Sequence, residues 1–141
     1  MIYLTRRENF NAAHKLYRPD WTEEQNQKEF GKCANPNWHG HNYSLFVTVK
    51  GEVGRDTGYL VNLKDLSALI KTLITDKLDH KNLNLDVDFM RGKMASTEVL
   101  AVAIFEQLKS PVSKLGGELH CVKVQETENN FVEYYGGNKL M

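Results

Sequence analysis

The hydrophobic pattern changes its period in the middle of the chain, and this change limits the folds that the sequence can adopt. From Asn62 onward, apolar residues recur every three or four positions, as in an amphipathic helix with Asn62 as its N-cap. A second helix is expected from Ser96, another N-cap residue, through the apolar run VLAVAIFEQL to about Pro111. The first apolar stripe consists of Leu63, Leu66, Leu69, Ile70, Leu73 and Ile74.

Segments typical of β-strands lie on both sides of this helical block. Residues 1–13 and the run NYSLFVTVKGEV precede it, and the runs ELHCVKVQE and NFVEYYG follow it, joined by a hairpin at TENN. Strands segregated from helices predict an α+β fold: a four-stranded antiparallel sheet with two helices packed on one face, in the order strand-strand-helix-helix-strand-strand. A chain of 141 residues is expected to form a single domain, 1–141. A long polar excursion, residues 17–37, separates the first two strands, and EEQNQKEF within it can form a short helix.

Charge and composition exclude several classes of protein. The 18 basic and 18 acidic side chains cancel, and the basic stripe that nucleic-acid phosphates require is missing from the sequence. No apolar run is long enough to span a membrane, and the N-terminus lacks the apolar core of a signal peptide. Both cysteines, Cys33 and Cys121, are therefore expected to stay reduced. We expect a soluble, cytoplasmic protein that binds neither nucleic acid nor membranes.

The motif HGH at the start of the second strand is the strongest chemical signal. Residues two apart in a strand point to the same side, so His39 and His41 present their imidazoles together. His14 completes a triad if the first strand pairs antiparallel with the second. Three imidazoles with an open fourth position are typical of a catalytic zinc site. Two other interpretations stay open at this point: a chance pair on a half-exposed strand, and a closed site that uses Cys33 as a fourth ligand.

Four other side chains are candidates for chemistry. Cys33 lies in the polar loop GKCANPN, where a thiol can act as a base or nucleophile, although an idle surface thiol is the alternative. Asp79 precedes His80 at a helix end, so the carboxylate could raise the basicity of the imidazole, although the helix dipole alone also favours histidine there. Glu126 continues an apolar strand face, which is an unusual place for a carboxylate unless it receives a ligand.

Several stretches, taken together and in this order, resemble the 6-pyruvoyl-tetrahydropterin synthase family, which includes 6-carboxy-tetrahydropterin synthases. The resemblance covers nearly the whole chain and implies a tunnelling fold, assembled as trimers or hexamers with active sites between subunits. It implies Zn²⁺ bound by His14, His39 and His41. The stretches that carry it are FNAAHKLY, GKCANPNWHGHNYSLFVTVKGEV, TGYLVNLKDL, LDHKNLN, STEVLA and VQETENN.

The resemblance also implies roles for the remaining candidates. Cys33 would be the general base, with Asp79 and His80 as its catalytic partners. Glu126 would anchor the pterin ring. Further residues expected to line the pterin pocket are Ser96, Thr97 and Glu98.

The implied reaction converts 7,8-dihydroneopterin triphosphate to 6-pyruvoyl-tetrahydropterin with release of triphosphate, a carbon–oxygen lyase reaction to which Mg²⁺ could contribute at the phosphates. The cysteine-to-histidine spacing and the ENN hairpin favour this product. The alternative is 6-carboxy-tetrahydropterin for queuosine synthesis, which STEVLA favours. Trp38 replaces the small residue that commonly precedes the first paired histidine in this family. Two rival classes are a binding module without turnover and a hydrolytic zinc enzyme, for which the sequence lacks an H-E-x-x-H motif.

Overall fold

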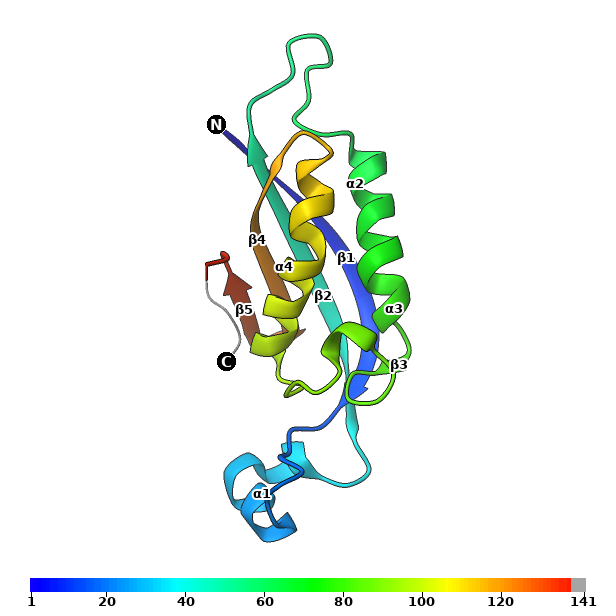
Figure 1. Ribbon diagram of the computed structural model, residues 1–141, viewed down its shortest axis with the longest axis vertical. Helices are drawn as coiled ribbons and strands as arrows, with labels where there is room; N and C mark the ends of the chain where they lie inside the picture. The colour runs from blue at the N-terminus through cyan, green and yellow to red at the C-terminus, as the bar shows by residue number, and fades with distance from the viewer. Residues whose placement is uncertain (138–141) are drawn as a thin grey trace.

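A computed structural model describes residues 1–137, so the last four residues of the expected single domain lie outside the described part. The fold is an α+β layer structure in which helices cover one face of a twisted sheet (Figure 1). The strands are β1 (Ile2–His14), β2 (His39–Gly51), β3 (Lys81–Asn82), β4 (Glu118–Thr127) and β5 (Asn130–Tyr134). The helical segments are α1 (Glu23–Phe30), η1 (Gly31–Ala34), α2 (Leu63–Ile70), η2 (Lys71–Thr75), α3 (Asp76–Leu78), η3 (Asp88–Met90) and α4 (Thr97–Ser113).

The sheet has the strand order β3-β1-β2-β4-β5. The four long strands pair antiparallel, as the sequence predicts. A fifth strand, β3, pairs parallel with β1 at Ala12 and Ala13. The predicted count of four strands misses it because two residues are too few to show a period. The fold class itself is confirmed.

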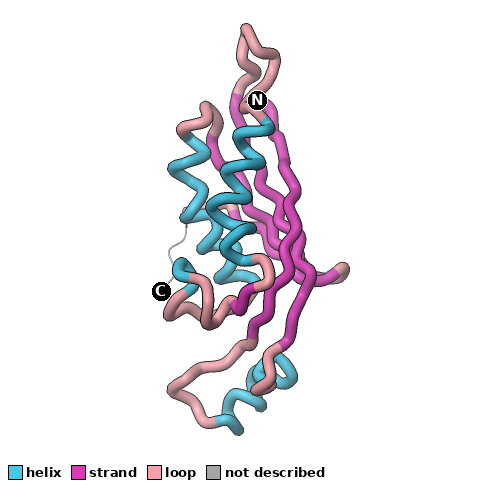
Figure 2. Tube along the Cα trace, turned by 90° about the vertical axis from the view of Figure 1, so that its right-hand side faces the viewer, coloured by secondary structure: helices cyan, strands magenta, loops and turns pink. Residues whose placement is uncertain are grey.

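All the helices except α1 lie on one face of the sheet, and α1 lies beyond one end of it (Figure 2). Both predicted N-caps are present: Asn62 accepts hydrogen bonds from the first turn of α2, and Ser96 accepts one from Val99 in α4. Helix α4 continues past Pro111 to Ser113, since the fixed φ of proline is compatible with helical backbone. None of the helices within residues 1–137 has the length and apolarity needed to cross a bilayer.

Helices α2 and α3 form one continuous helical run, interrupted by the π-helical segment η2. Leu66, Ile70, Ile74 and Leu78 are all fully buried on this run, at intervals of four residues. In a regular α-helix, each interval of four overshoots a full turn by about 40°. A wider π turn compensates for this drift. The segment therefore keeps all four side chains against the sheet.

The buried side chain of Ile74, inside the π segment, tests whether this packing stabilises the fold. We expect Ile74→Ala to lower the free energy of unfolding by about 2–5 kcal/mol, through lost apolar contact and a residual cavity. Leu63→Ala is the matched control, because Leu63 is 49% exposed on the same helical run. It should change stability by less than about 0.5 kcal/mol. Equal losses in urea titrations of the two variants would contradict this account of the core.

Candidate active site

The pairing of β1 with β2 brings three histidines together at one end of the sheet. In this antiparallel register, His14 lies opposite His39, and Ala12 lies opposite His41. The imidazole centroids are 4.5 Å apart for His14 and His39, 5.1 Å for His14 and His41, and 5.0 Å for His39 and His41. One ligand nitrogen from each ring lies within 4.8 Å of the others. The antiparallel pairing on which the triad depended is thus present.

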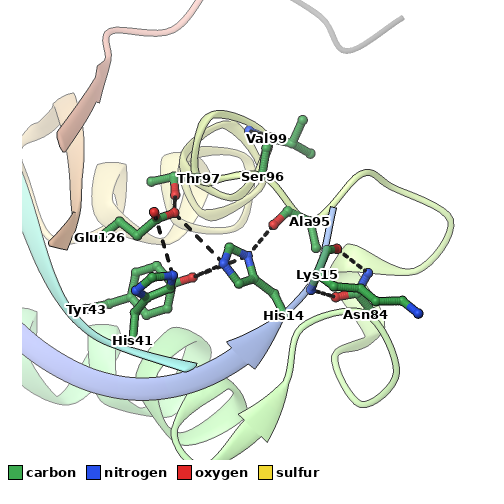
Figure 3. A network of polar contacts seen from close by, with 10 residues as sticks. All are labelled: His14, Lys15, His41, Tyr43, Asn84, Ala95, Ser96, Thr97, Val99 and Glu126. Atoms are coloured by element: carbon green, nitrogen blue, oxygen red, sulfur yellow. Dashed lines mark hydrogen bonds and ion pairs between the residues drawn. The ribbon is translucent and has the colours of Figure 1, made fainter. Parts of the chain in front are cut away.

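His14 is held in one tautomer by a backbone contact. Its Nδ1 lies 2.7 Å from the carbonyl oxygen of Ala95, which can only accept a hydrogen bond, so Nδ1 carries the proton (Figure 3). The lone pair is then on Nε2, toward the other histidines. The ring of His14 is 2% exposed, and burial lowers the pKa of His14. Burial also lowers the pKa of His39. Neutral imidazoles are the form that binds metal ions.

The donor set fits a divalent metal ion. Nδ1 of His39 and Nε2 of His41 are buried and have no hydrogen-bond partner within residues 1–137. Buried polar atoms without partners are costly, and a shared metal ion would satisfy both. Three neutral imidazoles suit zinc but also other first-row ions. Cys33 is not in the ligand cluster of the described residues, so the geometry favours a three-histidine site with an open position over the closed alternative.

Glu126 faces the open side of the triad. Its Oε1 lies 3.7 Å from Nε2 of His41, and its Oε2 lies 4.0 Å from Nε2 of His14. The hydroxyl of Thr97 donates a short hydrogen bond to Oε2 (Figure 3). Glu126 is therefore a carboxylate fixed at the end of β4, with Oε1 directed to the metal-binding histidines.

Two hollows meet at Glu126. The smaller, of about 290 Å³, is also lined by Ser96, Thr97 and Glu98 at the start of α4. The larger is an open groove of about 740 Å³, which His41 and Asp79 also line. The start of α4, the histidine triad and Asp79 thus surround one carboxylate. Every sequence-predicted substrate-binding residue lies on the smaller hollow.

Asp79 and His80 follow α3 and do not form its last turn, as the sequence interpretation had assumed. His80 has a positive φ of 62°, which ends the helical run. Its Nδ1 lies 3.0 Å from a carboxylate oxygen of Asp79. The backbone N–H of Asn11 also donates to this carboxylate at 2.8 Å, and this hydrogen bond is the main cause of the lowered pKa of Asp79. The imidazole of His80 is 82% exposed, so it is accessible from outside the subunit.

Cys33 lies in η1, away from the strands that carry the histidines. It is a free, partly buried thiol. Its carbonyl oxygen accepts a hydrogen bond of 2.7 Å from the backbone N–H of Leu16. Within residues 1–137, no hydrogen bond or ion pair joins its side chain to His14, His39 or His41. The structure therefore places the thiol near the root of β1 but not in contact with the triad.

Sequence reasoning missed two groups that shape the site. The hydroxyl of Tyr43 lies 3.4 Å from Nε2 of His14, and the ring is 1% exposed. Strand alternation could have found Tyr43, since it shares a face with His39 and His41. Burial raises the pKa of Tyr43, so its hydroxyl stays protonated. The carbonyl of Ala95 carries no sequence signal, because any residue supplies one.

Comparisons with known proteins agree with this geometry. The family model described as 6-pyruvoyl tetrahydropterin synthase matches residues 3–137. A 6-pyruvoyl tetrahydrobiopterin synthase of Homo sapiens is 45% identical over 133 residues, covering 94% of this chain and 90% of the relative. A 6-carboxy-5,6,7,8-tetrahydropterin synthase of Bacillus subtilis is 33% identical over 131 residues, covering 89% of this chain and 80% of the relative.

A solved structure extends the likeness to three dimensions. The 6-pyruvoyl tetrahydropterin synthase of Caenorhabditis elegans superimposes with a TM-score of 0.88 at 35% sequence identity, covering 96% of each chain. Sequence and fold thus point to one family over almost the full length of both proteins. This chain belongs to the 6-pyruvoyl tetrahydropterin synthase family.

Proposed function

We propose that this protein is a lyase that converts 7,8-dihydroneopterin triphosphate to 6-pyruvoyl-tetrahydropterin and triphosphate. The observation that carries the proposal is the neutral histidine triad with its open side next to Glu126. A metal-binding side and a pterin-binding carboxylate are what this reaction requires. The 45% identity to a protein named 6-pyruvoyl tetrahydrobiopterin synthase supports the same activity.

His14, His39 and His41 would hold a zinc ion. When bound, zinc supplies positive charge that polarises substrate oxygens and acidifies the carbons beside them. The protein's own contribution is to keep the three rings neutral and correctly turned. Ala95 does this for His14 through the hydrogen bond to Nδ1. A Mg²⁺ ion at the triphosphate remains an expectation of the family resemblance.

Glu126 would bind the pterin ring. The ring's amino and amide N–H groups are adjacent donors, and a carboxylate accepts from both in a bidentate arrangement. Thr97 holds the carboxylate in place from the side of α4. Ser96 and Glu98 line the same hollow, so we assign them to the pterin pocket. This places the substrate's side chain toward the histidines.

Cys33 and the Asp79–His80 pair would move the protons. The overall change is redox-neutral: triphosphate leaves with its bonding electrons, and two hydrogens move from the side chain to the ring as protons. We assign removal of a side-chain proton to Cys33 and its return to His80. The carboxylate of Asp79, 3.0 Å from Nδ1, would orient His80 and stabilise its protonated form.

We further propose that complete sites form between subunits. His80 is exposed, and neither it nor Cys33 contacts the triad within the described part of one chain. Both edges of the sheet also have free pairing capacity. Strand β1 pairs with β3 only at Ala12 and Ala13, and β5 pairs with β4 alone among the described strands. Unpaired edges favour association with other copies. A trimer or hexamer would bring these groups together.

The 6-carboxy product is the second candidate. Its support is the weaker identity, 33%, to the Bacillus subtilis relative. Both reactions begin from the same substrate and use the same classes of group. They differ in whether the side chain loses two carbons as acetaldehyde.

Product analysis separates these two candidates. We expect zinc-loaded protein incubated with 7,8-dihydroneopterin triphosphate to yield the 6-pyruvoyl product and free triphosphate, measured by mass spectrometry. A 6-carboxy product with acetaldehyde would replace the proposed activity with the second candidate. Unchanged substrate in the presence of bound zinc would contradict both.

The metal assignment is tested by removing one imidazole. We expect His39→Ala to lower zinc from about one ion per chain to near zero, because two imidazoles bind zinc far more weakly than three. His120→Ala is the matched control, since His120 packs against Tyr3 and Tyr135 away from the triad. Cys33→Ala should also keep its zinc while losing turnover. Loss of zinc from Cys33→Ala in elemental analysis would make Cys33 a ligand.

The pterin anchor is tested at Glu126. We expect Glu126→Gln to weaken pterin binding about 10- to 100-fold, because a charge-assisted acceptor is replaced by a neutral amide. Zinc content should stay unchanged. Glu106→Gln, an exposed position on α4, is the control and should bind like the wild type. Equal affinities of all three proteins in fluorescence titration would remove Glu126 from the proposed site.

A further inference from the structure

The excursion between β1 and β2, residues 15–38, carries Cys33 but contributes no strand to the sheet. In Figure 1 it extends beyond the end of the sheet, with α1 at its far side. A base on such an excursion needs something to fix it relative to the histidines. The contacts at the two ends of the excursion supply this.

Lys15 and Trp38, the first and last residues of the excursion, are joined by a cation–π contact. The ammonium nitrogen of Lys15 lies 4.7 Å from the ring centroid of Trp38 and 4.3 Å from that of Tyr17. One cation therefore contacts two aromatic rings, one from each end of the excursion. These three residues, Lys15, Tyr17 and Trp38, are called the clamp below.

The clamp is tied to the rest of the domain through Asn84. The side-chain oxygen of Asn84 accepts from the backbone N–H of Lys15 at 3.0 Å, and its amide donates to the carbonyl of Lys15 at 3.0 Å (Figure 3). Lys15 also directly follows the metal-binding candidate His14. The cation at the centre of the clamp thus has a fixed backbone.

Trp38 holds a backbone conformation that favours glycine. Its φ is 67°, in the left-handed region that a bulky residue rarely adopts. The next residue is His39. A tryptophan at this position needs a contact that holds its ring, and the described contact is the one with Lys15. The family's usual small residue could not make this contact.

Cys33 is connected to the same region by its backbone. Its carbonyl accepts from the N–H of Leu16, the neighbour of Lys15. Helix α1 is tied to the same end of the excursion, since Asn26 exchanges hydrogen bonds with the backbone N–H and carbonyl of Arg18. A movement at Lys15 and Leu16 would therefore move Cys33.

We propose that the clamp fixes the Cys33 loop relative to His39 and so positions the thiol for proton transfer. Lys15, Tyr17 and Trp38 are positioning residues in this proposal, and they act on the substrate only through Cys33. The inference rests on the function proposed above, in which Cys33 is the base.

The test opens the clamp from each side in turn. Trp38→Asn removes the ring while keeping a residue that tolerates positive φ. Lys15→Met removes the charge while keeping the length of the side chain and leaving Trp38 in place. Trp38→Phe retains an aromatic ring and serves as the conservative variant. Zinc content and the folded fraction of each variant are measured first.

Two readouts need no substrate. Hydrogen exchange at the Leu16 amide reports whether the Cys33 carbonyl still holds it, and alkylation of Cys33 by iodoacetamide reports exposure of the thiol. We expect both to accelerate at least about fivefold in Trp38→Asn and Lys15→Met, and by less than about twofold in Trp38→Phe, since a partly opened loop exchanges and reacts faster. Alkylation of the buried Cys121 serves as the internal control and should not change.

Turnover completes the test. We expect kcat to fall about 10- to 100-fold in Trp38→Asn and Lys15→Met, with KM changed less than about twofold, because misplacing a base affects the chemical step more than binding. Wild-type exchange and alkylation in both variants would overturn the clamp. A raised KM in Lys15→Met with unchanged exchange would overturn it too, and would make Lys15 a ligand of the triphosphate.

Failure of the proposed function gives a different result. If the wild type leaves the substrate unchanged while Cys33 alkylation still accelerates in both variants, the clamp holds the loop and the assigned reaction is wrong. If the wild type turns over and the variants match it in kcat, the function stands and the positioning role is wrong.

Discussion

The register between β1 and β2 is the constraint on which the site depends. Side chains alternate between the two faces of a strand, so a slip of one residue would turn every side chain of β1 to the opposite face. His14 would then leave the triad, and Phe10 and Ala12 would leave the core. The apolar residues that stabilise the sheet therefore also fix the position of the metal-binding nitrogens. Folding and site assembly are specified by the same pairing.

The helix-covered face of β2 changes in polarity along its length. Val49, Val47 and Leu45 are fully buried, Tyr43 follows, and His41 and His39 complete the row. The end with the histidines contains buried nitrogens without partners, and this lowers the stability of the metal-free protein. Ligands that bind only the folded state add stability, about 2.7 kcal/mol at a concentration of 100 Kd. Metal binding and folding should thus be coupled at this end of the sheet.

Sequence reasoning recovered the features with local signals. The N-caps Asn62 and Ser96, the hairpin between β4 and β5 and the shared face of His39 and His41 all follow from residue type and period. Features that depend on tertiary contacts carried no such signal. Strand β3 exists only because β1 is beside it, and the Ala95 carbonyl reaches His14 across the fold. The left-handed backbone of Trp38 is contrary to the residue's own preference, so no local rule could predict it.

The π turn in η2 makes the length of this helical run a structural property in its own right. Deleting any single residue between Lys71 and Thr75 would allow regular α geometry, at the cost of turning everything that follows by about 100° around the helix axis. Either Leu78 would leave the core or the chain after it would leave Asn11, to which both Asp79 and His80 are hydrogen-bonded. Substitutions in this segment can be absorbed one side chain at a time. A change in residue number cannot, so relatives that keep this arrangement of Asp79 and His80 should tolerate sequence variation in the segment while keeping its length fixed.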